Sequence, residues 1–239
     1  AILSDHNNHK LAFLERDEDH VWKDKCVNLA KDGLLPRLTD KSQAVRKAAI
    51  TACGSFGDTM HSEMLQSLLW NLNHDPSAAN RSAAIESVPC NVNSIDHLIQ
   101  RVRDIKVNVR VDAIDAIRTK MNVADMTYSQ FCLLIQTGLT DRCKQTQEAT
   151  ARLVCTSWIK FAKYDPIELI KVVGPIVNEE ECEKIVGVLM NCDEAELLKD
   201  FSDPEIRAFQ QGICHTPTVL SHDFEMTPEA ALFARVKAS

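Results

Sequence analysis

Apolar side chains recur at helical spacing along most of the chain, in segments that come in pairs. A first pair is predicted around CVNLAKDGLLPRL (26–38) and the segment after it, where Val45, Ala48, Ala49 and Ala52 share one helix face. Later segments give further pairs, and a last helix begins at Pro228. The ranges of these later pairs are 131–139 with 144–162, 166–177 with 181–191, and 194–201 with 204–213. The pattern predicts antiparallel helices joined by tight turns.

A short polar phrase returns every 29 to 37 residues and marks the turn inside each pair. It consists of Asp, then Arg six positions later, then Ala. Three copies are complete, a fourth has Gln147 in the Arg position, and a fainter fifth starts at Asn178 with Lys184 in that position. The complete copies are Asp40 with Arg46, Asp75 with Arg81, and Asp104 with Arg110. A fixed period of this size predicts an all-α solenoid of stacked antiparallel helix pairs rather than a globular enzyme.

The residues of this phrase have a structural interpretation. Asp is expected to cap the second helix of each pair by accepting a backbone N–H hydrogen bond. Arg is expected to pair with an acid of a neighbouring repeat, so that the ion pairs form a ladder along the stack. Direct contact of Arg46, Arg81 and Arg110 with a ligand is the alternative.

Composition supports a single helical stack. The 239 residues are 45% hydrophobic but only 5% aromatic, with 7 glycines, which favours helices over strands. No apolar run is long enough to span a membrane, and the first residues lack the pattern of a signal peptide. We expect one solenoid over 1–239, with 1–10 disordered and 214–227 as a loop. Trp70 and Trp158 lie on apolar helix faces and are predicted core residues.

The residue types needed for catalysis or metal binding are not arranged for either. Nine cysteines occur without a CxxC pair, and Cys214, His215 and His222 fit no zinc spacing. Neither a phosphate-binding GxxxxGK[ST] loop nor a nucleophile–base arrangement is present. We therefore expect no enzymatic activity, no cofactor and no metal, and a surface rather than a pocket as the functional site.

Charge is distributed unevenly. The whole chain has a net charge of −7, which argues against a nucleic-acid partner. Yet residues 97–163 carry 11 basic and 6 acidic side chains, a net of +5, between segments of −3 (1–96) and −9 (164–239). Phosphate binding responds to the local field, so the middle segment is a candidate for it.

Four segments, in this order, resemble one family. They are VRDIKVNVRVDAI (102–114), GLTDR (138–142), SWIKFAKYDPIELI (157–170) and MTPEAALFAR (226–235). Together with the repeated phrase, which is typical of HEAT repeats, they are similar to the HEAT-repeat subunit 3 of condensin, the chromosome-associated protein G family. The resemblance covers roughly residues 31–236. Gln147 and Ala234 depart from the family pattern, which usually has a basic residue and Trp there. Family subunits are several times longer, so the chain is expected to cover part of one.

The resemblance implies a non-catalytic scaffold for mitotic chromosome condensation, located in the nucleus, on chromosomes and partly in the cytoplasm. A kleisin segment would lie along the solenoid, duplex DNA would bind a basic groove through its phosphates, and ATP hydrolysis would belong to the SMC partners. The alternative is a HEAT scaffold that binds only proteins, such as a transport receptor or a phosphatase platform. A duplex-DNA titration separates the two.

The candidate phosphate contacts are basic residues outside the ladder. Those beside the turns at Asp104 and Asp141 are expected to lie on one edge of the stack, about 10 Å apart from repeat to repeat. The alternative is that each is merely a solvated surface cation. The full set is Lys41, Lys47, Arg101, Arg103, Lys106, Arg118, Lys120, Arg142, Lys144, Lys160 and Lys163.

Overall fold

The fold is known from a computed structural model. It describes residues 31–57, 60–174, 178–192, 204–205, 207–208, 210–211 and 227–238, and all regular structure within these ranges is helical. The expectations for residues 1–10, 194–201 and 214–226 lie outside the described residues. The chain divides into two compact units, residues 1–88 and 89–239, and each is described by itself. The expectation of one continuous solenoid stays a prediction.

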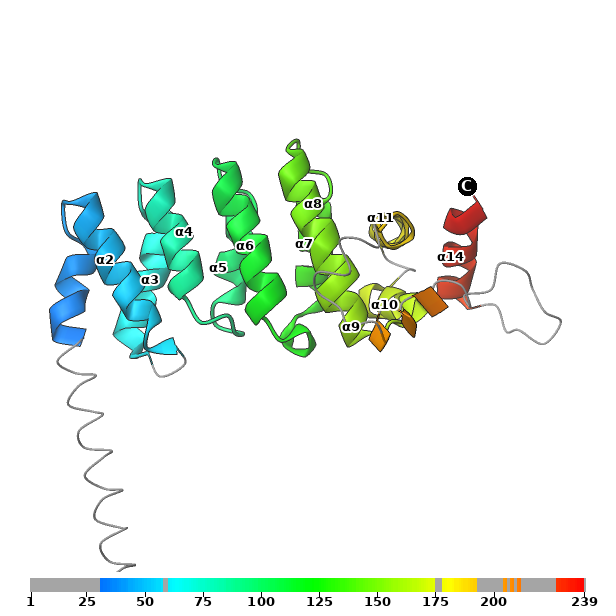
Figure 1. Cartoon of the computed structure of the whole chain (residues 1–239), viewed down its shortest axis with the longest axis horizontal. Coiled ribbons are helices and arrows are strands. Elements are labelled where there is room, and N and C mark those ends of the chain that lie inside the picture. Colours follow the sequence, from blue (N-terminus) through cyan, green and yellow to red (C-terminus); the bar gives the residue numbers. More distant parts are fainter. Residues whose placement is uncertain are drawn as a thin grey trace, which may run out of the picture. The chain divides into compact units, whose positions relative to one another are not determined.

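The first unit consists of two helical hairpins. Residues 31–38 are helical and are followed by α2 (Gln43–Gly54), while α3 (Ser62–His74) is followed by α4 (Ala78–Ser87). The helices α2 and α4 pack against each other, and α3 packs against α4 (Figure 1). The side chains of Leu38, Ile50, Leu68 and Leu72 are fully buried between them. Burial of these apolar side chains, at about 1.5–3 kcal/mol each, is the main force that holds the hairpins together.

The second unit continues the pattern of paired helices. Two hairpins, α5 with α6 and α7 with α8, are followed by a π-helical segment, η3, and by α9, α10, α11 and α14 (Figure 1). The bounds are α5 (Ile95–Arg101), α6 (Val107–Lys120), the 3₁₀ turn η2 (Val123–Asp125), α7 (Tyr128–Gly138), α8 (Lys144–Leu153), η3 (Val154–Trp158), α9 (Ile159–Phe161), α10 (Pro166–Val173), α11 (Glu179–Met190) and α14 (Pro228–Ala238).

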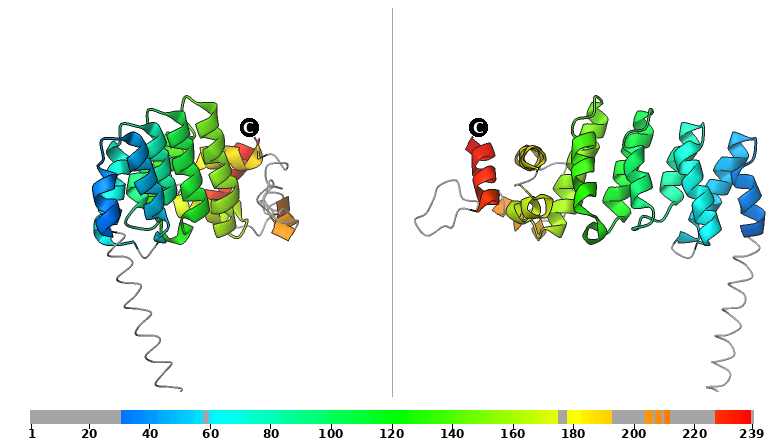
Figure 2. Two further views of the ribbon diagram at one scale, coloured as in Figure 1. Left: turned by 60° about the vertical axis from the view of Figure 1, so that its left-hand side comes forward. Right: turned by 180° about the vertical axis from the view of Figure 1, so that it is seen from behind.

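Equivalent helices of neighbouring hairpins in the second unit stack on each other. Helix α5 packs against α7 and α6 against α8, so first helices form one layer and second helices the other. Opposite views of the ribbon show the two layers (Figures 1 and 2). Trp158 is fully buried and meets Phe131 edge-on, with ring centroids 4.7 Å apart. This pair ties η3 to α7, and the prediction that Trp158 is a core residue is confirmed.

The long helix predicted at 144–162 is present, but it changes type along its length. It is α-helical to Leu153, π-helical through η3, and α-helical again in α9. The helix ends at Phe161, and the turn after it contains Lys163 and Tyr164, two consecutive non-glycine residues with φ of 54° and 65°. The N–H of Tyr164 donates to the Ile159 carbonyl at 2.8 Å, which closes this turn. A π-helical turn and left-handed residues are costly, so packing must hold this segment in place.

Two local expectations are wrong. Trp70 is 54% exposed and stacks only on His74 of its own helix, at 5.4 Å, because its position on α3 faces solvent rather than the neighbouring helices. Asp75 is expected to cap the second helix of its pair, but α4 starts at Ala78 with Ser77 as its N-cap. The turn is therefore longer than the sequence pattern indicated, and Asp75 lies before the N-cap.

Gly138 permits a close approach of α7 and α8, which gives a stability prediction. A Cβ at this position would lie 2.2 Å from Thr150 Oγ1 and 3.0 Å from Thr150 Cβ. We expect Gly138→Ala to destabilise the chain by about 1–3 kcal/mol, because the helices must move apart. Gly187→Ala is the matched control in α11, where a new Cβ meets nothing within 4 Å. It should stabilise by about 0.5–1 kcal/mol. Urea denaturation measures both, and equal shifts of the same sign would contradict the close approach.

Candidate nucleic-acid interface

Each turn between paired helices is built around the carboxylate of its Asp. In four successive repeats this carboxylate accepts the backbone N–H two residues further on, at 2.7–2.9 Å. These bonds join Asp40 to Ser42, Asp75 to Ser77, Asp104 to Lys106 and Asp141 to Cys143. The accepted N–H belongs to the N-cap residue itself, so the Asp organises the turn and sets where the second helix starts.

The residue six positions after each Asp reaches back to the same turn. Its side chain donates to the carbonyl oxygen of the Asp at 2.6–2.9 Å in all four repeats. The donors are Arg46, Arg81, Arg110 and Gln147. This contact explains how Gln147 can stand in the Arg position, since an amide N–H suffices for it. Each turn is therefore fixed at both ends, which holds the side chains on it in a defined place.

Two of the arginines also bridge to the next repeat. Arg46 donates to both carboxylate oxygens of Asp75, at 2.7 and 3.0 Å. Arg110 pairs in the same two-pronged way with Asp141, at 2.9 and 3.0 Å. All four side chains are buried or nearly so. These are the contacts of a structural ladder, and they engage all three guanidinium nitrogens of both arginines.

The electrostatics of the Arg46–Asp75 pair follow from its burial. Burial acts to raise the pKa of Asp75, but hydrogen bonds from Arg46, Asn80 and the Ser77 N–H outweigh it and leave the pKa below its usual range. The hydrogen bond to Asp75 likewise raises the pKa of Arg46. Both groups therefore stay charged at neutral pH and neutralise each other.

Four of the predicted phosphate contacts gather on two adjacent turns of the second unit. Arg103 and Lys106 lie on the α5–α6 turn, and Arg142 and Lys144 lie at the α7–α8 turn. All four are exposed, and we call them the tip cluster. Figure 1 shows both turns at the same edge of the unit. Among the described residues Arg103, Lys106 and Arg142 make no ion pair, while Lys144 meets Glu148 at 3.4 Å in an exposed contact that is worth little.

The two turns share a depression of about 520 Å³, whose rim carries Arg103 and Arg142. Ile105 projects there with 79% of its surface exposed. The first turns of α6 and α8 start at this edge, and neither contains an acidic residue. The positive ends of two helix dipoles thus lie beside the cationic side chains, and the carboxylates of Asp104 and Asp141 line the same depression. The sequence analysis missed this contribution, although the absence of Asp and Glu after each turn could have revealed it.

The other candidates of the second unit are not part of this cluster. Arg101 is near the first turn but is half-buried and paired with Asp104 at 3.4 Å. Four more lie at the far ends of their helices, about 20 Å away by helical rise. Arg118 there pairs with Asp115 at 3.1 Å and Lys160 with Glu205 at 2.7 Å. Lys120 and Lys163 are exposed. The structure does not bring these residues together with the tip cluster.

Lys41 and Lys47 belong to the first unit. Both are exposed, Lys41 on the turn before α2 and Lys47 on α2 itself. Neither forms an ion pair with another described residue. The first turns of α2 and α4 also lack acidic residues, as in α6 and α8. The first unit therefore repeats the chemistry of the tip cluster on a smaller scale.

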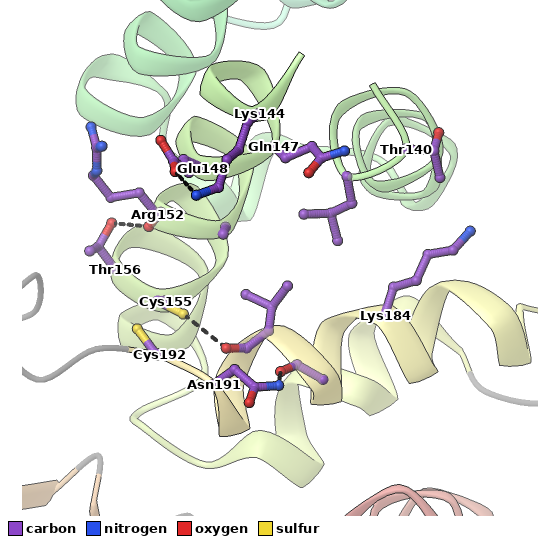
Figure 3. A pocket seen from close by; sticks show the side chains of 14 residues that line it. Thr140, Lys144, Gln147, Glu148, Arg152, Cys155, Thr156, Lys184, Asn191 and Cys192 are labelled. Atoms are coloured by element: carbon purple, nitrogen blue, oxygen red, sulfur yellow. Dashed lines mark hydrogen bonds and ion pairs between the residues drawn. The ribbon is translucent and has the colours of Figure 1, made fainter. Parts of the chain in front are cut away.

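A pocket of about 760 Å³ separates α8 and α11 in the second unit. It is lined by α8 and η3 on one side and by α11 on the other (Figure 3). In contrast to the α6–α8 junction, no Arg–Asp bridge spans this junction, because Gln147 replaces Arg and Asn178 replaces Asp. Asn178 instead donates to the Val173 carbonyl at 3.3 Å. Helix α11 also begins with Glu179, Glu180 and Glu181, which makes its N-terminus unfavourable for an anion.

The described residues contain neither a candidate membrane span nor a candidate metal site. None of these helices is long and apolar enough to cross a membrane. No group of three or more His, Cys, Asp or Glu side chains within the described part could hold a metal ion.

The paired helices and the repeated Asp turns form a HEAT-repeat fold. In agreement, a family model described as HEAT repeats matches residues 29–89. The all-α HEAT-repeat fold predicted from the sequence is thus confirmed. The similarity extends to particular proteins. Over 207 residues, 80% of this chain, it is 22% identical to human condensin complex subunit 3, and over 218 residues it is 24% identical to the Schizosaccharomyces pombe subunit of the same name.

A solved structure agrees. The chain aligns over 89% of its length, with a TM-score of 0.70 and 21% identity, with a chain in the crystal structure of the S. pombe condensin Cnd3–Cnd2 subcomplex. The resemblance to condensin subunit 3 seen in the sequence motifs is confirmed. The chain spans 20–23% of the length of the human and S. pombe subunits and 26% of the solved chain.

Proposed function

We propose that this chain is part of a non-catalytic condensin regulatory subunit that binds duplex DNA through phosphates and holds a kleisin segment. It acts in mitotic chromosome condensation, in the nucleus and on chromosomes, with a share in the cytoplasm. The SMC ATPases are indirect partners, since ATP hydrolysis is assigned to them. The observation that carries the DNA part is the tip cluster: exposed cations on adjacent turns, three of them without an ion pair among the described residues.

Geometry supports phosphate contact without base recognition. The Asp carboxylate and the residue six positions later fix each turn, so the cations stand on rigid supports. Phosphate contacts position a protein on DNA and carry no sequence information. Arg46 and Arg110 are left out of the proposed contacts because their guanidinium groups are engaged in the turns and in ion pairs. We therefore assign non-specific binding to the tip cluster, with Lys41 and Lys47 as secondary contacts.

The kleisin part rests on similarity. The matching solved structure is a subcomplex of Cnd3 with Cnd2, and Cnd2 is the kleisin. A kleisin segment that folds on the solenoid would order only upon binding and would complete the DNA site.

Titration of the chain with a labelled duplex of mixed sequence tests the proposal. If about four cations neutralise phosphates, the slope of log K against log salt is about −3.6, and affinity falls about 150-fold between roughly 50 and 200 mM salt. A second duplex of unrelated sequence should bind equally well, and a kleisin peptide should tighten binding. A chain that binds the peptide but shows no salt-dependent DNA affinity would instead be a protein-only scaffold.

A further inference from the structure

Two cysteines from opposite walls of the α8–α11 pocket lie against each other. Cys155 belongs to η3 and Cys192 follows the end of α11, and both line the cavity. Figure 3 shows the two sulfur atoms side by side. The thiol of Cys155 also donates to the Val188 carbonyl at 3.8 Å. The two residues are 37 positions apart in the sequence, so a bond between them would join two repeats.

The environments of the two thiols differ in a way that suits exchange chemistry. Cys155 is buried, whereas Cys192 is partly exposed. The hydrogen bond with Cys192, together with burial, raises the pKa of Cys155, so Cys155 keeps its proton, and the more accessible Cys192 is the thiol that an oxidant in the pocket reaches first. Cys192 also lies outside the helices, so its Sγ can move to the S–S distance of a disulfide, about 2.0 Å, without breaking a helix.

The pocket can admit a small oxidant, and the charge of its lining affects which oxidant binds. Among the described residues its lining includes the cations Lys144, Arg152 and Lys184 and one acid, Glu148. Lys144 pairs with Glu148 at 3.4 Å and Lys184 pairs with Glu180 at 2.8 Å, which leaves the lining with an excess of positive charge. The cavity of about 760 Å³ is large enough for one half of a tripeptide disulfide. An anionic ligand is favoured at such a lining over a cationic one.

We propose that Cys155 and Cys192 are a modification site, which forms a reversible disulfide by exchange with an anionic low-molecular-weight disulfide of the glutathione class. The Cys192 thiolate attacks one sulfur of glutathione disulfide, and glutathione thiolate leaves. The released thiolate takes the proton of Cys155, whose sulfur attacks Cys192 and expels the second glutathione as thiolate. Two electrons pass from the cysteines to glutathione disulfide, and the walls of the pocket become covalently joined. Lys144 belongs both to the tip cluster and to the lining of this pocket, but neither cysteine belongs to the tip cluster, so the exchange itself needs no DNA contact.

Peptide mapping of the full chain after incubation with glutathione disulfide tests the proposal. Trypsin should yield residues 153–160 joined to residues 185–199, since each peptide contains one of the two cysteines and no other. Reduction should separate the peptides. In Cys155→Ser the resolving thiol is absent, so Cys192 should retain one glutathionyl group. If Cys155 and Cys192 are alkylated as completely as in the untreated chain, or if Cys192 pairs with Cys143 instead, the proposal is wrong.

A second variant tests the role of charge. Lys184→Gln removes one cation from the lining of the pocket and leaves both thiols in place. It should slow oxidation by glutathione disulfide but not by the neutral hydroxyethyl disulfide. Equal slowing by both oxidants, or by neither, would overturn the assignment of an anionic oxidant.

Discussion

Replacement of Asp75 by alanine is expected to lower the free energy of unfolding by about 3–5 kcal/mol. The carboxylate is 1% exposed and accepts bonds from Arg46, Asn80 and the Ser77 N–H. Removing it leaves a nearly buried guanidinium without its partner and a turn without its organising acceptor. An unpaired buried charge costs more than the pair itself contributes, which is why this substitution should be severe.

Two controls separate the charge from the turn. Asp75→Asn keeps the shape and one acceptor oxygen, so it should destabilise less than alanine. Glu63→Ala removes the acid of an exposed pair with Lys31 and should change stability little. Chemical denaturation followed by circular dichroism provides the measurement. Similar losses for Asp75→Ala and Glu63→Ala would show that the Arg46–Asp75 bridge does not hold the repeats together.

The Arg46–Asp75 pair also predicts how the stability of the chain depends on pH. Because the pKa of Asp75 is lowered by folding, its stabilisation is present above the ordinary carboxyl value of 3.8 and is lost as the pH falls through the lower folded value. The difference in stability between the native chain and Asp75→Ala should therefore be constant near neutrality and shrink below about pH 4. A difference that grows on acidification would contradict the assigned pairing.

The sequence predicted the helices better than it predicted their ends. The repeat period and the apolar spacing were sufficient to predict the helix pairs. Each helix must bury one continuous apolar face, and this requirement determines both the period and the spacing. The starts of the second helices were displaced, since Asp75 binds the N–H of the N-cap residue rather than that of the first turn. The pattern also could not reveal η3, because a π-helical turn changes no apolar spacing over so short a stretch.

Exposure of single residues was harder to predict from the sequence. Trp70 and Trp158 occur in similar apolar contexts, yet one is 54% exposed and the other fully buried. The difference depends on which side of the helix the next repeat covers, and this is set by tertiary packing. The same holds for Gln147, which in the sequence is only a departure from the Arg of the repeated phrase. The structure shows that it keeps the contact with its own turn and loses the bridge to the next repeat.

The candidate site was predictable only in part. Sequence spacing placed Arg103, Lys106, Arg142 and Lys144 beside turns, and turns of successive hairpins meet at one edge. Spacing could not show that Arg118 and Lys160 are at the other ends of their helices and paired with acids. The basic segment of the sequence therefore forms two separate groups of cations in the structure, and the tip cluster is the group that we propose as the phosphate contact.

This division yields the sharpest test of the DNA proposal. In the double variant Arg103→Glu and Arg142→Glu, two phosphate contacts are lost, so the slope of log K against log salt should change from about −3.6 to about −1.8. Repulsion from the new carboxylates should weaken binding further at low salt. Neither residue makes an ion pair among the described residues, so the fold should be unaffected.

The matched control changes the net charge by the same amount, but at the opposite ends of the helices. Lys120→Glu with Lys163→Glu also alters the charge by −4, but these residues lie outside the tip cluster. If net charge alone governed affinity, both double variants would weaken binding alike. If the tip cluster contacts the phosphates, only the first variant changes the slope, because counterion release counts contacts rather than total charge. Equal slopes for the two variants would remove Arg103 and Arg142 from the interface and would leave condensin similarity as the sole support for DNA binding.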